Sequence, residues 1–163
     1  MSSWWILTKK YFERTAELRN QYGEDRVVTF IGACTEQADM DEAIRFAVNH
    51  FGGVDILFKP GWLSRSSWVD AILPEQLDRA MDVTCTGAYR AALAAMPYMK
   101  EQHGGHIINF TSLGGRGNRM VAISYASSKG RMYRPDQGSG YGVGTLWNQC
   151  DCICPWNAEY KAV

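Results

Sequence analysis

The chain has 163 residues, 46% of them apolar and 21% charged, which is the usual composition of a globular protein with one core. Lys and Arg total 17, as do Asp and Glu, so neither a basic surface for nucleic acid nor an acidic tail is expected. No apolar run approaches the roughly 18 residues of a membrane span, and the short run at residues 4–7 does not resemble a signal peptide. We therefore expect a cytoplasmic protein without nucleic-acid or membrane partners.

The first elements of the chain are predicted to be a helix and then a strand. Residues 10–22 have the polarity pattern of a helix, and Gly23 is placed to end it. Residues 26–31 read Arg-Val-Val-Thr-Phe-Ile, a run of strongly β-prone side chains. The order of these two segments is the first step of an alternating pattern that continues along the chain.

The clearest helix of the sequence is expected at residues 40–51. Asp39 and Glu42 have the spacing of a capping box at its start, and Gly52 is placed to close it. The apolar run at residues 54–58 then predicts a buried strand. The apolar residues that recur at intervals of three and four in this helix are Met40, Ala43, Ile44, Ala47, Val48 and Phe51.

Helices and strands keep alternating in the second half of the chain. Pro74 is suited to the first turn of a helix, and a long Ala-rich helix is expected at residues 87–102. An apolar strand follows at residues 106–110. This alternation predicts a parallel sheet with right-handed crossovers and a ligand site beyond the carboxyl ends of the strands. The residues of the Ala-rich helix expected to face the core are Ala91, Ala92, Ala95 and Met99.

Ser112, Tyr125 and Lys129 have a spacing suited to carbonyl chemistry. In a helix, Tyr125 and Lys129 lie one turn apart on one face, and Ser112 follows the strand at 106–110. A nearby ammonium stabilises a phenolate, so Tyr125 could exchange a proton with a substrate while Ser112 hydrogen-bonds the same oxygen. The alternative is structural: a packing aromatic, a solvated lysine and a serine in a turn.

At these residues the chain resembles the short-chain dehydrogenase/reductase family. The resemblance covers residues from about Arg14 to Gly130, and a further short stretch at residues 152–156 is also similar. It implies a Rossmann-type sheet, binding of NAD or NADP, and catalytic places for Ser112, Tyr125 and Lys129. It also implies that Tyr125, Lys129 and Gly61 contact the cofactor. The phrases that carry it are Val54-Asp-Ile-Leu57, Thr86-Gly-Ala-Tyr-Arg90, Pro97-Tyr-Met-Lys100 and Gly105-His-Ile-Ile-Asn-Phe-Thr-Ser112.

Several positions depart from the family pattern, mainly where the cofactor would bind. Family members open with a strand, a glycine-rich turn and a helix that receives the pyrophosphate, and this chain begins about one βαβ unit later. Ala33 stands where an acid is usual, residues 58–61 replace an Asn-Asn-Ala-Gly phrase, and Thr84 replaces an Asn. Lys59, within the replaced phrase, is expected to be an exposed loop lysine; the alternative is that it supplies one replacement charge for a phosphate. The predicted fold is therefore an incomplete Rossmann-like parallel sheet flanked by helices, missing the first βαβ unit.

The character of the sequence changes after Gly130. Pro135 and four alternating glycines at 138–144 predict that the helix carrying Lys129 stops early and that a flexible connector follows. We expect one domain, with 14–130 as the family-like core, 131–149 as the connector and 150–163 as a short terminal strand and tail. Cys150, Cys152 and Cys154 would share one face of that strand. A thiol-lined strand is expected there, because the spacing suits a metal poorly.

Two functions remain open from the sequence. The first is an NAD(P)-dependent oxidoreductase that interconverts a small alcohol and a ketone. The second is a truncated, catalytically silent dehydrogenase-like protein that acts as an interaction module or survives as a remnant. In the family's sheet the strand expected at residues 27–31 lies apart from that at 54–58, and the strands between them are not encoded here. A strand from residues 4–7, direct pairing or a second copy could close this gap, so we expect an oligomer or a poorly soluble monomer.

Overall fold

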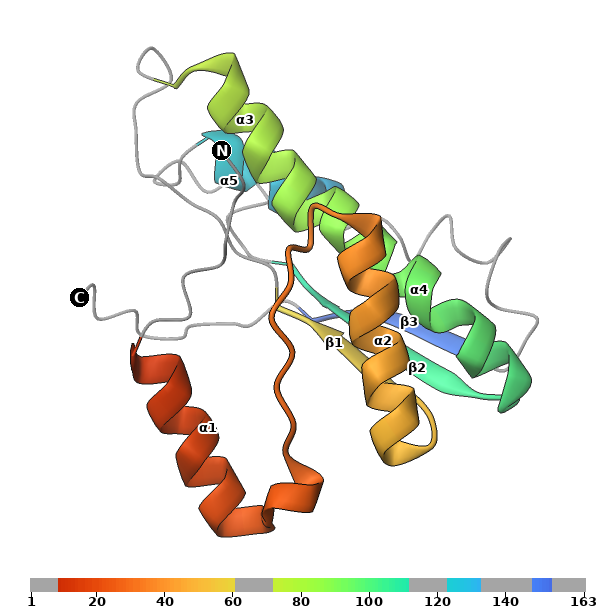
Figure 1. The fold of residues 1–163 in the computed structure, drawn as a ribbon. Coiled ribbons are helices and arrows are strands. Elements are labelled where there is room, and N and C mark those ends of the chain that lie inside the picture. The colour runs from red at the N-terminus through yellow and green to blue at the C-terminus, as the bar shows by residue number, and fades with distance from the viewer. Residues whose placement is uncertain (1–8, 61–71, 112–122, 133–147, 154–163) are drawn as a thin grey trace.

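The computed structural model describes residues 9–60, 72–111, 123–132 and 148–153, which are the coloured parts of Figure 1. Three parallel strands form the sheet in these residues, and helices lie against it. Two short helical segments accompany the longer ones: a 3-10 turn at Glu24–Arg26 and a π-turn at Asp82–Thr86. The helices are α1 (Lys9–Tyr22), α2 (Gln37–Phe51), α3 (Pro74–Met81), α4 (Gly87–Glu101) and α5 (Ile123–Met132); the strands are β1 (Ile56–Lys59), β2 (Gly105–Phe110) and β3 (Asn148–Ile153).

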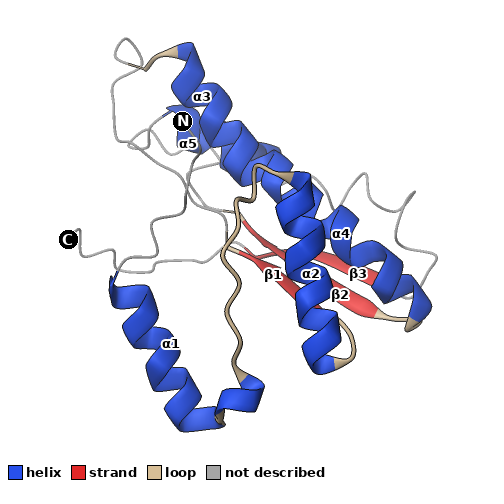
Figure 2. Ribbon diagram, in the orientation of Figure 1, coloured by secondary structure: helices blue, strands red, loops and turns tan. Residues whose placement is uncertain are grey.

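The sheet has the strand order β1-β2-β3, with both pairs parallel. Ile56 of β1 lies opposite His106 of β2, and Lys59 lies opposite Asn109. Each connection between neighbouring strands carries helix, as the alternating sequence pattern predicts (Figure 2). The expected fold class, an incomplete Rossmann-like parallel sheet flanked by helices, is confirmed.

The core lies between α4 and one face of the sheet. Met99 and Ala95 of α4 are fully buried, and they form a cluster with Val54 and with Ile107 of β2. Gly105 permits this close packing, since a Cβ atom there would lie 2.6 Å from Cγ of Met99. Helix α2 packs beside α4, as Figure 1 shows. The prediction of an Ala-rich helix that faces the core is confirmed.

The prediction that residues 54–58 form a buried strand is wrong in two respects. The strand covers Ile56–Lys59, and its side chains alternate between an exposed and a partly buried face. Ile56 is 59% exposed and Phe58 is 52% exposed. Successive side chains of a strand point to opposite faces, and the helix packed on the core face leaves the other face open to solvent.

The N-terminal helix is confirmed, but the strand expected at residues 26–31 is not formed. Gly23 ends α1 with a φ of 100°, and its N–H bonds the carbonyl of Arg19 at 2.8 Å. Val27 is extended, yet its carbonyl oxygen accepts a hydrogen bond from Nε of Arg19 at 3.0 Å. A β-prone segment becomes a strand only when a neighbouring strand takes its backbone groups, and none of the described residues does so here.

Helix α2 starts three residues earlier than predicted, and the expected capping box is absent. The carboxylate of Asp39 instead accepts the N–H of Ala33 at 2.7 Å, so it fixes the loop before the helix. Gly52 closes the helix as expected, with a φ of 85° and a hydrogen bond from its N–H to Val48 O. Pro74 opens α3, which is also as predicted. None of the helices in the described part of the chain is both long and apolar enough to span a bilayer.

Candidate active site

Helix α5 lies at the carboxyl end of β2, where two hydrogen bonds join the strand to the helix. The hydroxyl of Thr111 donates to the backbone carbonyl of Lys129 at 2.8 Å. The ammonium of Lys129 donates back to the carbonyl of Phe110 at 2.6 Å. Thr111 and Lys129 are 3% and 2% exposed, so this pair of bonds is shielded from water. A buried ammonium, that of Lys129, therefore lies at the carboxyl end of β2. Parallel α/β sheets bind their ligands at this carboxyl edge.

The π-turn between α3 and α4 packs against the same helix. Cys85 donates a hydrogen bond from its thiol to the carbonyl of Ser128 at 3.1 Å, which holds the π-turn against α5. Thr84 is 1% exposed, and its hydroxyl has no hydrogen-bond partner among the described residues. Single π-helical turns are unstable in isolation and are frequent at functional sites. An unsatisfied buried hydroxyl is costly as well, so this turn carries two features that folding alone does not favour.

Lys129 has a perturbed acid-base equilibrium. Its pKa is lowered from 10.5 to about 8, first by burial, which disfavours the charged form, and then by the nearby positive charge of Lys59. Cys85 acts in the opposite direction and raises the pKa of Lys129. Lys129 therefore remains mainly protonated at neutral pH, but it loses its charge about two and a half pH units below an ordinary lysine.

Lys59 is the second lysine at this edge, and its position corrects the sequence prediction of an exposed loop lysine. It is the last residue of β1, lies opposite Asn109 in the sheet and is only partly exposed. Burial lowers the pKa of Lys59 below its ordinary value, and Cys34 opposes that effect. The strand explains this burial, because Lys59 lies two residues after Leu57 and so points to the helix-covered face.

The residues predicted to be catalytic are only partly within the described structure. Tyr125 and Lys129 both belong to α5 and lie one turn apart along it. Ser112 and Gly61 lie outside the described residues, as does the side chain of Tyr125. The convergence of the three side chains stays a prediction. The structural alternative is wrong for Lys129, because a solvated charge would not be 2% exposed.

The cysteine pattern near the C-terminus falls partly on β3. Cys150 and Cys152 are in that strand, opposite Ile107 and Asn109 of β2, whereas Cys154 lies outside the described residues. The described side chains contain no group of three or more His, Cys, Asp or Glu residues that could hold a metal. The division of the chain into core, connector and tail stays a prediction.

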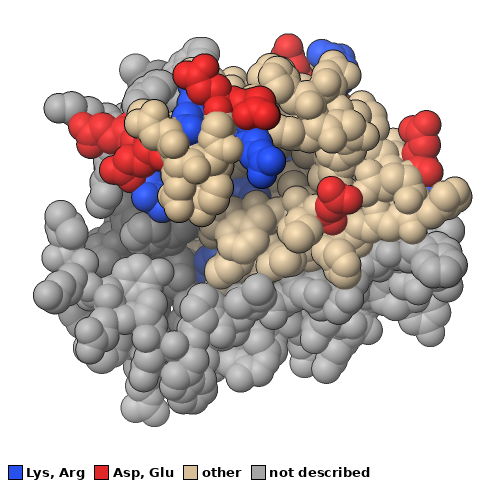
Figure 3. All heavy atoms as spheres, turned by 90° about the horizontal axis from the view of Figure 1, so that it is seen from below, with Lys and Arg blue, Asp and Glu red and all other residues tan. Residues whose placement is uncertain are grey.

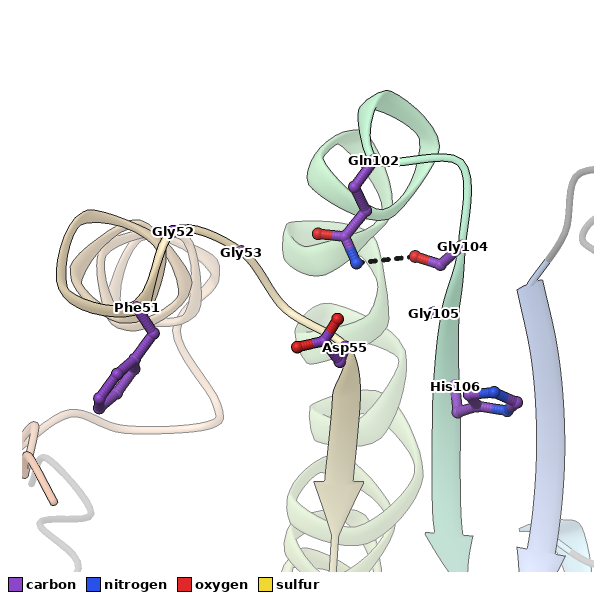
Figure 4. A pocket seen from close by; sticks show the side chains of 8 residues that line it. All are labelled: Phe51, Gly52, Gly53, Asp55, Gln102, Gly104, Gly105 and His106. Carbon is purple, nitrogen blue, oxygen red and sulfur yellow. Dashed lines mark hydrogen bonds between the residues drawn. The ribbon is translucent and has the colours of Figure 1, made fainter. Parts of the chain in front are cut away.

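A hollow of about 540 Å³ lies at the opposite end of the sheet, where the strands begin (Figure 4). Asp55, directly before β1, and His106 of β2 line it, and Gln102 lines it from the end of α4. The amide of Gln102 donates to the carbonyls of Val54 at 2.9 Å and Gly104 at 2.8 Å. These bonds link the segments directly before β1 and β2. The hydrogen-bonding groups of the Gln102 amide therefore stabilise the fold.

The sequence analysis missed Cys85 and Thr111 near the carboxyl edge, and it expected Lys59 to be exposed. The two-residue period of the strand would have placed Lys59 on the face of Leu57 if β1 had been extended by one residue. Thr111 is the residue directly before the predicted catalytic serine. No pattern in the sequence indicates that Cys85 contacts α5, because this contact depends on the π-turn.

The carboxyl edge is chemically suited to an anionic ligand. It combines two partly or fully buried ammonium groups with an unsatisfied hydroxyl on the adjoining π-turn. A nucleotide with phosphate groups fits this donor set, since phosphate oxygens accept hydrogen bonds from ammonium and hydroxyl groups. Figure 3 shows Lys and Arg atoms near the centre of one face of the molecule, some of them set back in a hollow.

Solved structures share the fold at low sequence identity. A 3-ketoacyl-ACP reductase from Sinorhizobium meliloti 1021 superposes with a TM-score of 0.80 at 22% identity, covering 91% of this chain and 59% of that one. A gluconate 5-dehydrogenase from Burkholderia cenocepacia J2315, solved with NADP and tartrate, gives a TM-score of 0.75 at 23% identity and covers 88% and 57%. These likenesses establish the Rossmann-like architecture.

Sequence relatives lead to the same family. An uncharacterized oxidoreductase of Staphylococcus aureus strain USA300 is 29% identical over 133 residues, which are 82% of this chain and 58% of the relative. A similar protein of Staphylococcus epidermidis is 29% identical over 99 residues, covering 61% and 43%. The chain thus spans little more than half the length of the first of these relatives. The family model described as short chain dehydrogenase matches residues 5–133, so the chain belongs to the short-chain dehydrogenase family.

Proposed function

We propose that this chain provides the catalytic part of an NAD(P)-dependent oxidoreductase that interconverts a small alcohol and a ketone. In this proposal Tyr125 is the general acid/base, Lys129 lowers its pKa, and Ser112 hydrogen-bonds the substrate oxygen. The observation that carries the proposal is the buried Lys129 ammonium, fixed at the carboxyl end of β2 and one helical turn from Tyr125.

The position of Lys129 suits the role of a charge that tunes a phenol. A phenol titrates near pH 10, and an ammonium in a site shielded from water stabilises the phenolate more than an exposed one does. The pKa of about 8 for Lys129 leaves it charged at neutral pH, when its effect on Tyr125 is needed. The ammonium of Lys129 donates to the carbonyl of Phe110, and the backbone carbonyl of Lys129 accepts from the hydroxyl of Thr111. These two bonds fix the position of the charge.

NAD or NADP is the expected cofactor, and when bound in its reduced form it supplies the hydride that becomes the C–H bond of the alcohol. The chain's own residues supply the remaining parts: a proton from Tyr125 to the carbonyl oxygen and a hydrogen bond from Ser112 to that oxygen. Tyr125, Lys129 and Gly61 are the residues that would hold the cofactor. One proton donor and one hydrogen-bond donor, both directed at a single substrate oxygen, suit a small alcohol or ketone.

The proposal is tested by comparing two tyrosine variants. In Tyr125→Phe, turnover of an alcohol or ketone panel should fall by about a hundredfold or more, because the general acid/base is lost. The affinity for NADH or NADPH, followed by cofactor fluorescence, should change little. Tyr89→Phe is the matched control, since Tyr89 is 66% exposed on α4 and should leave both quantities unchanged.

Two results would contradict the proposal. Wild-type protein that shows no fluorescence change at millimolar NADH or NADPH binds neither cofactor, and the enzymatic function then fails. Retention of full turnover in Tyr125→Phe would remove the proposed acid/base role while leaving cofactor binding intact.

A second candidate function is an interaction module without turnover, and the exposed sheet face favours it. Ile56 and Phe58 are more than half exposed on that face, and exposed apolar side chains of a sheet favour association. For either function we expect an oligomer or a poorly soluble monomer. Size-exclusion chromatography with light scattering measures this, and a well-behaved monomer over a range of concentrations would contradict it.

A further inference from the structure

The hollow at the amino edge of the sheet contains a carboxylate that the fold does not use. Asp55 lies directly before β1 and lines this hollow of about 540 Å³. Its exposed side chain makes no hydrogen bond or ion pair with any other residue of the described ranges. The backbone of Asp55 is nevertheless held in place, because its carbonyl accepts the N–H of His106 at 2.8 Å. Figure 4 shows the carboxylate on the side of Gln102, whereas the ring of His106 points away from it.

Two helix ends add negative charge to the same place. Helices α2 and α4 both end beside the hollow, and Gly52 and Gln102, which follow their last turns, line it. The aligned peptide dipoles of a helix place about half a negative charge at its carboxyl end. The basic residues of these last turns, His50 and Lys100, are not among the residues that line the hollow. The electrostatic potential inside the hollow therefore favours a cation.

Gly104 keeps the hollow open, although neither the backbone nor the packing requires glycine there. A Cβ atom at Gly104 would meet no atom within 4 Å, and the φ of this residue is not in the left-handed region. The neighbouring glycines differ in this respect: Gly52 has a φ of 85°, and Gly105 packs against Met99. A side chain at position 104 would therefore occupy open space at the wall of the hollow without disturbing the fold.

We propose that this hollow binds a small molecule that carries a guanidinium group, with Asp55 as the residue that recognises its charge. A guanidinium presents parallel N–H groups that match the two oxygens of one carboxylate. Phe51 is 50% exposed and offers an aromatic wall for the carbon chain of the ligand or for the cation. The volume lies within the range of about 300 to 1,000 Å³ that is usual for small-molecule sites. A metal ion suits the hollow less, since the described side chains form no group of three or more metal ligands.

Binding at this hollow is independent of the proposed oxidoreductase function. The hollow lies where the strands begin, whereas Lys129 is held at the carboxyl end of β2, one helical turn from Tyr125. None of the residues that line the hollow takes part in the proton transfer proposed above. An active enzyme can therefore lack guanidinium binding, and a chain without turnover can show it.

A titration of the wild-type protein with butylguanidinium, followed by its backbone amide signals in NMR spectra, tests the proposal. Butylurea is the matched ligand, because it has nearly the same shape but no charge. Butylguanidinium should bind saturably, and butylurea should bind about tenfold more weakly, since the charged hydrogen bonds are lost. The amide signals of Gly52, Gly53, Gly104 and His106 should shift most, because these residues line the hollow.

Two variants separate the contribution of the charge from that of the open space. Asp55→Asn keeps the shape of the side chain and should lower the affinity for butylguanidinium about tenfold, while the affinity for butylurea stays unchanged. Gly104→Leu should weaken the binding of both ligands, because its side chain takes up part of the hollow. Glu101→Gln is the matched control: it makes the same change of charge at an exposed residue that does not line the hollow, and both affinities should stay within twofold of wild type.

Thermal melting without ligand checks that the variants fold. Asp55→Asn and Gly104→Leu should melt close to wild type, because the Asp55 side chain has no partner among the described residues and a Cβ at position 104 meets no neighbour. Three results would overturn the proposal: no saturable binding of butylguanidinium, equal affinity of the wild type for the two ligands, or unchanged binding by Asp55→Asn. Should Gly104→Leu fail to fold, the ligand pair and Asp55→Asn still decide the question.

Discussion

The two edges of the sheet differ in how their polar groups are satisfied. At the amino edge, the side chain of Gln102 accepts the N–H of Val54 at 3.2 Å and donates to the carbonyls of Val54 and Gly104. Figure 4 shows the amide between the beginnings of β1 and β2, with a hydrogen bond to Gly104. Every group in this set is neutral, and each bond joins two parts of the fold.

The carboxyl edge is built from charged or incompletely bonded groups. Lys129 is buried with a lowered pKa, Lys59 is partly buried beside it, and the Thr84 hydroxyl has no partner among the described residues. Each of these features reduces the stability of the folded state. The comparison indicates that the Gln102 bonds of the amino edge support the fold, whereas the carboxyl edge keeps polar groups that a ligand can use. Three changes test this difference.

The largest effect on stability is expected from Met99→Ala, in the core next to the amino edge. Met99 is 0% exposed and packs with Val54, Ala95 and Ile107, so its truncation leaves a cavity. The free energy of unfolding should fall by about 3 kcal/mol. Urea unfolding followed by circular dichroism measures the loss.

Leu93→Ala on the same helix is the control for Met99→Ala. Leu93 is 49% exposed, so its truncation should cost less than about 1 kcal/mol. Equal losses for the two variants would mean that α4 does not bury Met99 against the sheet, and the assignment of the core to this region would be wrong.

The pH dependence of stability tests the carboxyl edge. The pKa of Lys129 is about 8 in the folded protein and 10.5 ordinarily, so between these values the unfolded chain binds more protons than the folded one. Stability due to this residue should therefore be constant below pH 8, rise between about pH 8 and 10.5, and level off above that range. We expect the rise to be on the order of 2 kcal/mol.

The contribution of Lys129 is isolated by a difference measurement. Urea unfolding of wild type and Lys129→Met at pH 7.5, 9 and 10.5 cancels the titration of thiols, tyrosines and other lysines shared by the two proteins. The neighbouring side chains that affect the pKa of Lys129 are those of Lys59 and Cys85, and they are present in both proteins. A difference that does not change with pH would show that Lys129 is as solvated as a surface lysine.

The sequence was sufficient for elements whose signals are local. Pro74, Gly23 and Gly52 marked helix boundaries correctly, because proline and glycine act on the backbone of their own residue. The repeating apolar residues of α4 also identified its buried side. The parallel sheet followed from the alternation of helices and strands, which leaves few other ways to connect them.

The sequence was not sufficient where the structure of a segment depends on contacts with residues far away in the chain. Residues 26–31 have β-prone side chains but no strand beside them, and the carboxylate of Asp39 bonds the loop at Ala33 instead of capping its helix. The burial of Lys59 depends on which face α4 covers, and the contact of Cys85 with Ser128 depends on a π-turn. The spacing to Tyr125 identified Lys129 as a candidate from the sequence. Its lowered pKa could not be predicted, because it results from burial and from the charge of Lys59 on the neighbouring strand β1.

The smallest effect is expected from Gln102→Leu at the amino edge. The change removes three hydrogen bonds, two of them to the backbone of Val54, and leaves backbone groups near water that can replace part of the loss. The free energy of unfolding should therefore fall by about 1 to 2 kcal/mol. Glu101→Gln is the control, because Glu101 is exposed at the end of α4 and should change stability by less than about 0.5 kcal/mol. Because Gln102 joins only the beginnings of the strands, turnover per folded molecule should stay at the wild-type value. A variant that keeps its stability but loses turnover would reverse the roles assigned to the two edges, since the amino edge would then act on the reaction and not on the fold.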